Sequence, residues 1–333
     1  MVASSARSVG TESGLGTILR AHPGRAASTD PGKTVQGDHV MAAVAEAKTC
    51  RQISVKPINP VIGAEITGVD LGREPDAAVA AEIRSAIFDH LVVFFPGQDI
   101  TPDQQAAFAR QFGDVPKVPD SMFRVHADNS CVSVLENDAE RPPTVNNWHS
   151  DYSFAAEPDF LSILHARSIP DVGGDTIWVN MYAAYEALTE PMKAHLDGRT
   201  ATHDFMKLYE RPFKRHLWEG ERFEYMEAAR QEHPPVRHPV VRTIPETGRR
   251  ALFVNESFTR NIEGLDERES ASLLDYLFEH IRTPEYQIRY RWEPGTLVVW
   301  DNRVTVHYAV ADYHPRHRLM HRVTVLNHEV PQA

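Results

Sequence analysis

A short segment near the middle of the chain places two metal-binding residue types two positions apart. These are His149 and Asp151, in the run N-W-H-S-D-Y at residues 147–152. On extended backbone, residues i and i+2 point to the same face, so this imidazole and this carboxylate can reach one cation. Two histidines and one carboxylate on one face leave coordination positions open, as Fe(II) oxygenases require. The segment therefore predicts two of the three ligands of such a site.

A third ligand is predicted at His307, far along the chain. Residues 302–308 alternate between polar and apolar side chains, a pattern that predicts a strand. On this strand His307 shares one face with Thr305, and apolar side chains occupy the other face. A histidine on the polar face of a strand suits the lumen of a barrel, where it could complete the ligand set.

Two arginines follow on the next predicted strand, residues 318–325. Arg318 and Arg322 share a face with Met320 and Thr324. Charged groups that point into a barrel are costly unless each is paired. A bound dianion would pair them, and the planar fork of a guanidinium matches a carboxylate with two parallel hydrogen bonds.

Structural explanations compete with each of these features. The chain has 17 histidines, and His126 and Asp128 have the same spacing as the first pair. His317 and His321 have the i,i+4 spacing of a metalloprotease helix, but the glutamate of that motif is absent and a strand is predicted there. Taken singly, the candidate ligands could be loop or core side chains with ordinary hydrogen bonds, and the arginines could lie on a solvated strand face.

The elements that must position these residues are mostly short strands. Thr101, Pro102 and Gln104 form a helix start with a capping box, and Asn180 and Thr189 are predicted to cap two later helices. Residues 200–222 show no period and are predicted to form a mobile lid. No internal repeat or nucleotide-binding glycine motif occurs, and the pattern predicts a mainly β, double-sheet barrel with flanking helices. Strands are predicted at residues 53–58, 64–69, 91–95, 287–292, 296–300, 304–310 and 318–326, and helices at 77–90, 101–112, 180–188, 189–196 and 264–281.

Length and composition predict one folded domain over residues 51–330. The 333 residues are 42% hydrophobic and 24% charged, as expected of a globular chain with a sizeable core. Residues 1–50 are rich in Ser, Gly, Ala and Thr without a sustained apolar period, so a disordered extension is predicted. Arginines in that extension leave a transit peptide open although acidic residues oppose it, and Met41 is an alternative start.

The charge and cysteine content exclude several classes of partner. The formal net charge of −11 disfavours binding to a nucleic-acid backbone, which needs concentrated lysine and arginine. The longest apolar run, residues 91–95, is far shorter than the ~18 residues of a membrane span. Two cysteines are too few for a disulfide scaffold and indicate a reduced, cytoplasmic setting. A small-molecule partner remains.

Several motifs occur in order along the chain and together resemble one enzyme family. They are W-H-S-D at 148–151, G-G-D-T at 173–176, W-D-N-R-x-x-x-H at 300–307 and R-x-x-x-R at 318–322. Further similarity lies at 62–71, 238–242 and 251–256. The set resembles the taurine dioxygenase (TauD/TfdA) family of Fe(II)- and 2-oxoglutarate-dependent oxygenases, from about residue 53 to about residue 326.

This resemblance implies a fold and a set of roles. The fold would be a double-stranded β-helix, a cupin-like jelly roll, with flanking helices. His149, Asp151 and His307 would bind the iron. Arg318 and Thr176 would hold the distal carboxylate of 2-oxoglutarate, and Arg322 would lie near the substrate.

The resemblance also implies a reaction. O₂ and 2-oxoglutarate would be consumed, succinate and CO₂ released, and a substrate C–H bond hydroxylated. Because the carboxylate of Asp151 is present, hydroxylation is favoured over the halogenation seen in relatives with a small residue there. Cleavage beside a leaving group and desaturation both remain open, and self-association into a homo-oligomer is expected.

The chain departs from taurine dioxygenase at the substrate positions. Val118 and Val145 stand where that enzyme has a histidine and an asparagine, and Tyr152 replaces a smaller residue after the aspartate ligand. Tyr209 and Phe258 match its aromatic pocket positions. The predicted substrate is therefore a larger, less polar molecule than taurine, with one anionic group for Arg322. The rival hypotheses are a non-catalytic metal- or anion-binding jelly roll and a zinc hydrolase.

Overall fold

The computed structural model describes residues 52–119, 124–210, 227–228 and 230–333. These residues belong to one unit, Cys50–Ala333. The predicted extension at residues 1–50 and residues 211–222 of the predicted lid lie outside the described residues.

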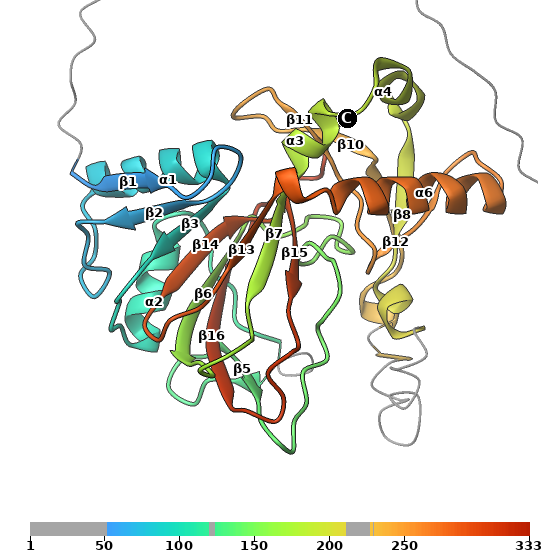
Figure 1. Cartoon of the computed structure of the whole chain (residues 1–333). Coiled ribbons are helices and arrows are strands. Elements are labelled where there is room, and N and C mark those ends of the chain that lie inside the picture. Colours follow the sequence, from blue (N-terminus) through green and yellow to red (C-terminus); the bar gives the residue numbers. More distant parts are fainter. Residues whose placement is uncertain (1–51, 120–123, 211–226, 229) are drawn as a thin grey trace, which may run out of the picture. The chain divides into compact units, whose positions relative to one another are not determined.

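Two antiparallel sheets build the scaffold of the molecule (Figure 1). The first sheet has the order β1-β2-β3-β14-β6-β16-β5-β4, and its single parallel pair is β2 with β3. The second sheet has the order β13-β7-β15. The strands of the first sheet are Ser54–Pro57, Ala64–Thr67, Val92–Phe95, Leu297–Asp301, Leu161–Ser168, Arg318–Val325, Ser133–Asn137 and Arg124–Val125, and those of the second are Gln287–Tyr290, Thr176–Asn180 and Thr305–Ala309.

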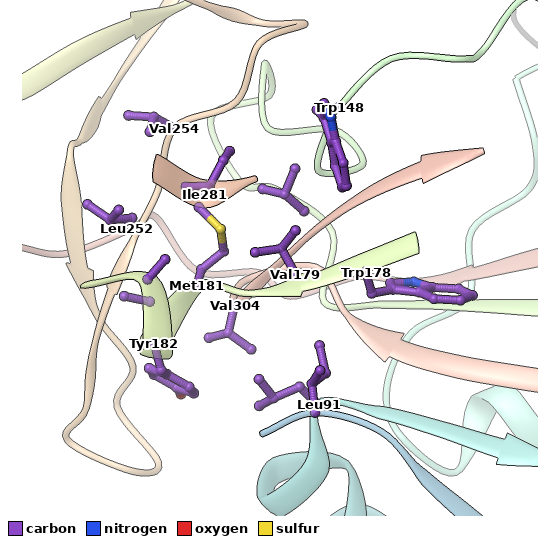
Figure 2. Close-up of a cluster of buried hydrophobic side chains, with 14 of the residues drawn as sticks. Leu91, Trp148, Trp178, Val179, Met181, Tyr182, Leu252, Val254, Ile281 and Val304 are labelled. Atoms are coloured by element: carbon purple, nitrogen blue, oxygen red, sulfur yellow. The ribbon is translucent and has the colours of Figure 1, made fainter. Parts of the chain in front are cut away.

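The strand residues alternate between two hydrophobic cores because successive side chains point to opposite faces. Phe94 and Val298 lie in one core with Trp178 of the second sheet. Val93 and Val299 lie in another core with residues of helices α1 and α2. Figure 2 shows part of the first core, where side chains of β7, α3 and α6 meet. This alternation makes the first sheet the middle layer between the helices and the second sheet.

The helices begin where local chemistry places their caps. In α2 (Pro102–Arg110), Thr101 and Gln104 form the predicted capping box. Asn180 caps α3 (Met181–Glu186) and Thr189 caps α4 (Glu190–Leu196), as predicted. The remaining long helices are α1 (Ala77–His90) and α6 (Glu267–Ile281), and none in the described part of the chain is long and apolar enough to cross a membrane.

The predicted mobile lid at residues 200–222, for which no period was found, contains regular elements in its first half. Thr200–His203 forms β8, which pairs with β9 (Val236–Pro239) and β12 (Thr259–Ile262), and Phe205–Tyr209 forms a 3₁₀ helix, η1. A four-residue strand is too short to show a period, and its partners lie far away in sequence. A two-stranded sheet of β10 (Val241–Thr243) and β11 (Arg250–Leu252) and a second 3₁₀ helix, η3 (Pro284–Tyr286), complete the described elements.

Candidate active site

His149 and His307 meet through their backbones. The amide of His149 donates to the carbonyl of His307 at 3.0 Å, and the amide of His307 donates back at 2.7 Å. This isolated antiparallel bridge extends β15 with the loop that carries His149. The two imidazole rings consequently lie with their centroids 4.1 Å apart.

Asp151 completes a buried group of three potential metal ligands. One ligand atom from each of His149, Asp151 and His307 lies within 4.8 Å of the others. Oδ1 of Asp151 is 3.6 Å from Nε2 of His149 and 3.9 Å from Nε2 of His307. Two imidazoles and one carboxylate at this separation could hold a divalent transition metal and leave positions for other ligands.

Neighbouring polar groups orient two of these side chains. Nδ1 of His149 lies 2.8 Å from the carbonyl of Asn147, which leaves Nε2 to face the centre of the group. Ser162 donates from Oγ to Oδ2 of Asp151 at 2.6 Å and accepts from Asn302 at 3.0 Å. Such partners behind metal ligands fix ring orientation and carboxylate position.

The electrostatic environment favours the protonation states that metal ligands need. Burial by itself would raise the pKa of Asp151, but the charge of Arg322 and the two imidazoles lower it to about 2. Burial, together with His149, lowers the pKa of His307 to about 3. At neutral pH the carboxylate is ionised and the His307 imidazole is neutral, and these are the forms that bind metal ions.

The structure brings Arg318 and Thr176 together around Trp292. The indole nitrogen of Trp292 donates to Oγ1 of Thr176 at 2.9 Å, and the guanidinium of Arg318 lies 6.0 Å from the Trp292 ring centroid. Arg318 and Thr176 are both almost completely buried. Tyr313 flanks Arg318 with its ring 5.7 Å away.

Gly174 permits the close approach of this arginine. Its φ of +77° is in the left-handed region, and a Cβ there would lie 3.3 Å from Cδ and Nε of Arg318. The backbone amide of Gly174 donates a hydrogen bond to Oδ1 of Asp312 at 2.8 Å, which fixes the turn before β7. Glycine is the residue that adopts such a conformation at low cost.

Arg322 lies on the same face of β16 as Arg318, as the alternation predicts. Its Nη1 is 3.5 Å from Oδ1 of Asp151. Met320, between the two arginines, lies in the core between the sheets, whereas Val323 and Val325 face the helices. The strand therefore presents one arginine beside the candidate metal ligands and another farther along the same face.

An aromatic cluster borders the loop that carries His149 and Asp151. Phe154, Phe205 and Phe258 are buried in it, and Tyr152 and Tyr209 pack against its edge. Ring centroids are 5.2 Å apart for Tyr152 and Phe154, and 4.8 Å for Phe154 and Phe258. Three of the six predicted substrate residues, Tyr152, Tyr209 and Phe258, thus share one apolar wall.

The two predicted substrate valines, Val118 and Val145, are not part of this cluster. Val145 is 48% exposed, and Val118 is half-buried in the loop after α2, where its amide donates to Ser130. Of the competing histidines, His126 interacts locally with Asp128, and His317 pairs with Glu136. His317 and His321 lie before and within a strand, which excludes the metalloprotease helix.

Several supporting residues were not predicted from the sequence. Ser162 and Asn302 hold the carboxylate of Asp151, and Trp292 and Tyr313 surround Arg318. Asn302 lies in the W-D-N-R run, close to His307 in the sequence, and this proximity could have identified it as a supporting residue. Ser162 and Trp292 reach the site only through sheet pairing, for which the sequence carries no local pattern.

Comparison with known proteins agrees with this geometry. The family described as "Taurine catabolism dioxygenase TauD, TfdA family" matches residues 54–324. An α-ketoglutarate-dependent sulfate ester dioxygenase of Pseudomonas putida is 35% identical over 295 residues, which cover 87% of this chain and 94% of that protein. An α-ketoglutarate-dependent 2,4-dichlorophenoxyacetate dioxygenase of Cupriavidus pinatubonensis is 35% identical over 270 residues, covering 77% and 91%.

A solved structure shows the same architecture. The crystal structure of a taurine dioxygenase from Burkholderia xenovorans superposes with a TM-score of 0.71 and 36% identity, over 84% of this chain and 91% of that one. This likeness confirms the expected jelly-roll fold. Family members use Fe(II), 2-oxoglutarate and O₂, and the donor set of two buried imidazoles and an ionised carboxylate fits Fe(II). The chain belongs to the TauD/TfdA family and is a 2-oxoglutarate-dependent non-haem iron dioxygenase.

Proposed function

We propose that this dioxygenase hydroxylates a small organic anion with an apolar body, and that His149, Asp151 and His307 bind its iron. The observation that carries this assignment is the convergence of three distant side chains to ligand atoms within 4.8 Å of one another. When bound, iron and 2-oxoglutarate supply the oxidising power, and 2-oxoglutarate is converted to succinate and CO₂. The protein supplies the binding groups, their orientation and the exclusion of water.

Arg318 is the proposed partner of the distal carboxylate of 2-oxoglutarate. The side chain is 6% exposed, its Nε has no hydrogen-bond partner, and no carboxylate among the described residues forms an ion pair with it. Burial lowers the pKa of Arg318, and Tyr313 alone offsets this effect. A buried guanidinium without a counter-ion is unfavourable, and a carboxylate beside the Thr176 hydroxyl would satisfy it.

Arg322 is the residue that we propose binds the anionic group of the substrate. Its guanidinium places a positive charge 3.5 Å from a carboxylate oxygen that the iron would also use. A substrate anion near this charge would hold a C–H bond close to the metal. The relatives named for sulfate esters and for 2,4-dichlorophenoxyacetate act on anions of this general kind.

The aromatic cluster is the proposed wall for the apolar body of the substrate. Tyr152 directly follows the Asp151 ligand, and its ring leads into the buried rings of Phe154 and Phe258. Val118 and Val145 offer no polar side chain to a taurine amine or sulfonate. These features support an alkyl sulfate, a sulfonate with a longer chain or an aryloxy carboxylate over taurine.

A substrate screen tests this proposal. Purified protein with Fe(II), 2-oxoglutarate and ascorbate is expected to release succinate in the presence of apolar anions and much more slowly with taurine. Product analysis then separates hydroxylation from cleavage or desaturation. Efficient turnover of taurine would contradict the substrate assignment. Activity with Zn²⁺ in the absence of 2-oxoglutarate would contradict the iron assignment and favour a hydrolase.

A further inference from the structure

Two arginines are almost completely buried on the side of the molecule where the chain ends, and only one of them is paired. Arg303 is 1% exposed, and its guanidinium donates to both carboxylate oxygens of Asp301 and to Glu246. Arg242, on β10, is also 1% exposed. Its guanidinium makes no hydrogen bond and no ion pair with any described residue, and Nε and Nη1 are inaccessible.

Aromatic and charged side chains surround the guanidinium of Arg242. Its guanidinium carbon lies over the ring of Phe253, 4.7 Å from the centroid, in a cation–π contact. Both oxygens of the neighbouring carboxylate, Asp301, accept hydrogen bonds from Arg303. Burial and the charge of Arg303 lower the pKa of Arg242 to about 10, so the group remains a cation at neutral pH. An unpaired cation in this position is costly unless an anion binds to it.

A cavity opens at this arginine. It has a volume of about 240 Å³ and is lined by β10, the following turn and the C-terminal segment, through Arg242, Thr243, Pro245, Glu329, Val330 and Gln332. The C-terminal segment is anchored there, because the amide of Thr243 donates to the carbonyl of Gln332 at 2.9 Å (Figure 1). A water molecule takes roughly 30 Å³ of liquid volume, so the cavity has room for a tetrahedral oxyanion with several waters.

Glu329 limits which oxyanion fits. Its carboxylate lines the same cavity as the guanidinium and can only accept hydrogen bonds. Sulfate is fully ionised near neutral pH and would repel this carboxylate. Hydrogen phosphate keeps a P–OH group, which can donate to the carboxylate while the other oxygens accept from the guanidinium. The pair therefore selects a protonated oxyanion.

We propose that this cavity is a second anion site, separate from the iron site, that binds hydrogen phosphate between Arg242 and Glu329. The phosphate can be free, or a terminal group on a small molecule in the protonation state that keeps a P–OH. Nothing in this assignment depends on the identity of the dioxygenase substrate.

Phosphate binding to the full-length protein tests the site. Thermal melting and calorimetric titration would be followed with inorganic phosphate and with sulfate at matched ionic strength, in excess 2-oxoglutarate. Wild-type protein is expected to bind phosphate saturably at concentrations up to about 10 mM, where a millimolar site is mostly filled. A terminal phosphate monoester measured in parallel distinguishes free from carried phosphate.

The variants assign the binding to this cavity. Arg242→Met is expected to weaken phosphate binding at least tenfold, whereas Arg249→Met, an arginine paired with Glu186 at the surface, leaves it unchanged. Arg318→Met also leaves it unchanged, because that side chain belongs to the 2-oxoglutarate site. Glu329→Gln is expected to raise sulfate affinity about tenfold, since an amide can donate where the carboxylate repels.

Three results would overturn the proposal. One is phosphate binding that Arg242→Met does not change, and another is binding that only Arg318→Met abolishes. If Arg242→Met does not fold, Glu329→Gln tests the proposal instead. Wild-type affinities for both phosphate and sulfate in Glu329→Gln would exclude phosphate binding between Arg242 and Glu329. Retained succinate release in Arg242→Met would show that the two sites are independent.

Discussion

The hydroxyl of Ser162 on β6 donates a 2.6 Å hydrogen bond to Oδ2 of Asp151, one of the candidate metal ligands. The same hydroxyl accepts from Asn302, which precedes β15. One small side chain on the first sheet thus bonds to the loop that carries His149 and Asp151 and to the segment that precedes His307. The carboxylate is left with Oδ1 facing His149 and His307.

Removal of this hydroxyl should weaken iron binding without abolishing the fold. We expect Ser162→Ala to reduce Fe(II) affinity by about 10- to 100-fold, because the carboxylate loses the partner that fixes its rotamer. Fe(II) titration of the anaerobic protein measures this change, and Ser162→Thr should restore most of the affinity. Ser133→Ala, which removes another buried hydroxyl next to β16, should leave iron affinity unchanged. Equal effects of the two alanine variants would contradict a specific role for Ser162.

Gly174 should control 2-oxoglutarate binding through Arg318. Gly174→Ala forces a Cβ to within 3.3 Å of the Arg318 side chain and strains a backbone with φ of +77°. We expect the KM for 2-oxoglutarate to rise about tenfold and the free energy of unfolding to fall by about 1–2 kcal/mol. Gly198→Ala is the matched control, since Gly198 also has a positive φ but no atom within 4 Å of its Cβ position. It should lose similar stability and keep its KM.

Arg322 should determine the preference for anionic substrates. We expect Arg322→Met to lower kcat/KM for an anionic substrate by about 10- to 100-fold relative to a neutral analogue of the same shape, because a charge-assisted contact is lost. Succinate release with both substrates measures the ratio. Arg167→Met, an exposed arginine that contacts the carbonyl of Ile100, provides the control. A ratio that stays at its wild-type value in Arg322→Met would exclude an anion contact at this position.

Two buried histidines outside the iron site should make stability depend on pH. Burial lowers the pKa of His238 to about 4 and that of His203 well below its usual value. Between pH 6.5 and 4 the unfolded chain binds protons at these positions and the folded protein does not. The free energy of unfolding should therefore fall as the pH decreases through this range, and it should be constant above pH 6.5. The fall that His238 contributes is at most about 3 kcal/mol.

Denaturant titrations at a series of pH values measure this slope. His238→Gln should reduce the fall in the free energy of unfolding between pH 6.5 and 4. His317 is an exposed histidine that pairs with Glu136, and His317→Gln should not reduce this fall in the same way. A wild-type stability that stays constant from pH 6.5 to 4.5 would contradict the assignment of a neutral, buried His238.

Local patterns in the sequence determined the elements and the direction of many side chains. The capping boxes and caps depend on residues within one helical turn, so Thr101, Asn180 and Thr189 marked their helices correctly. The period of two in a strand placed Arg318 and Arg322 on one face, and the spacing of His149 and Asp151 placed two ligands together. These relationships follow from backbone geometry over a few residues, and the order of the motifs was enough to identify the family.

Only the tertiary structure decided which distant groups meet. The bridge between His149 and His307, and the contact of Ser162 with Asp151, arise from strand pairing across large sequence separations. Arg303 and Arg242 show the same division, since both lie in segments that resemble the family and neither segment shows which arginine is paired. Packing brings Glu246 to Arg303, which also pairs with Asp301 two residues away. No carboxylate among the described residues forms an ion pair with Arg242, because the partners of a buried charge depend on the fold around it.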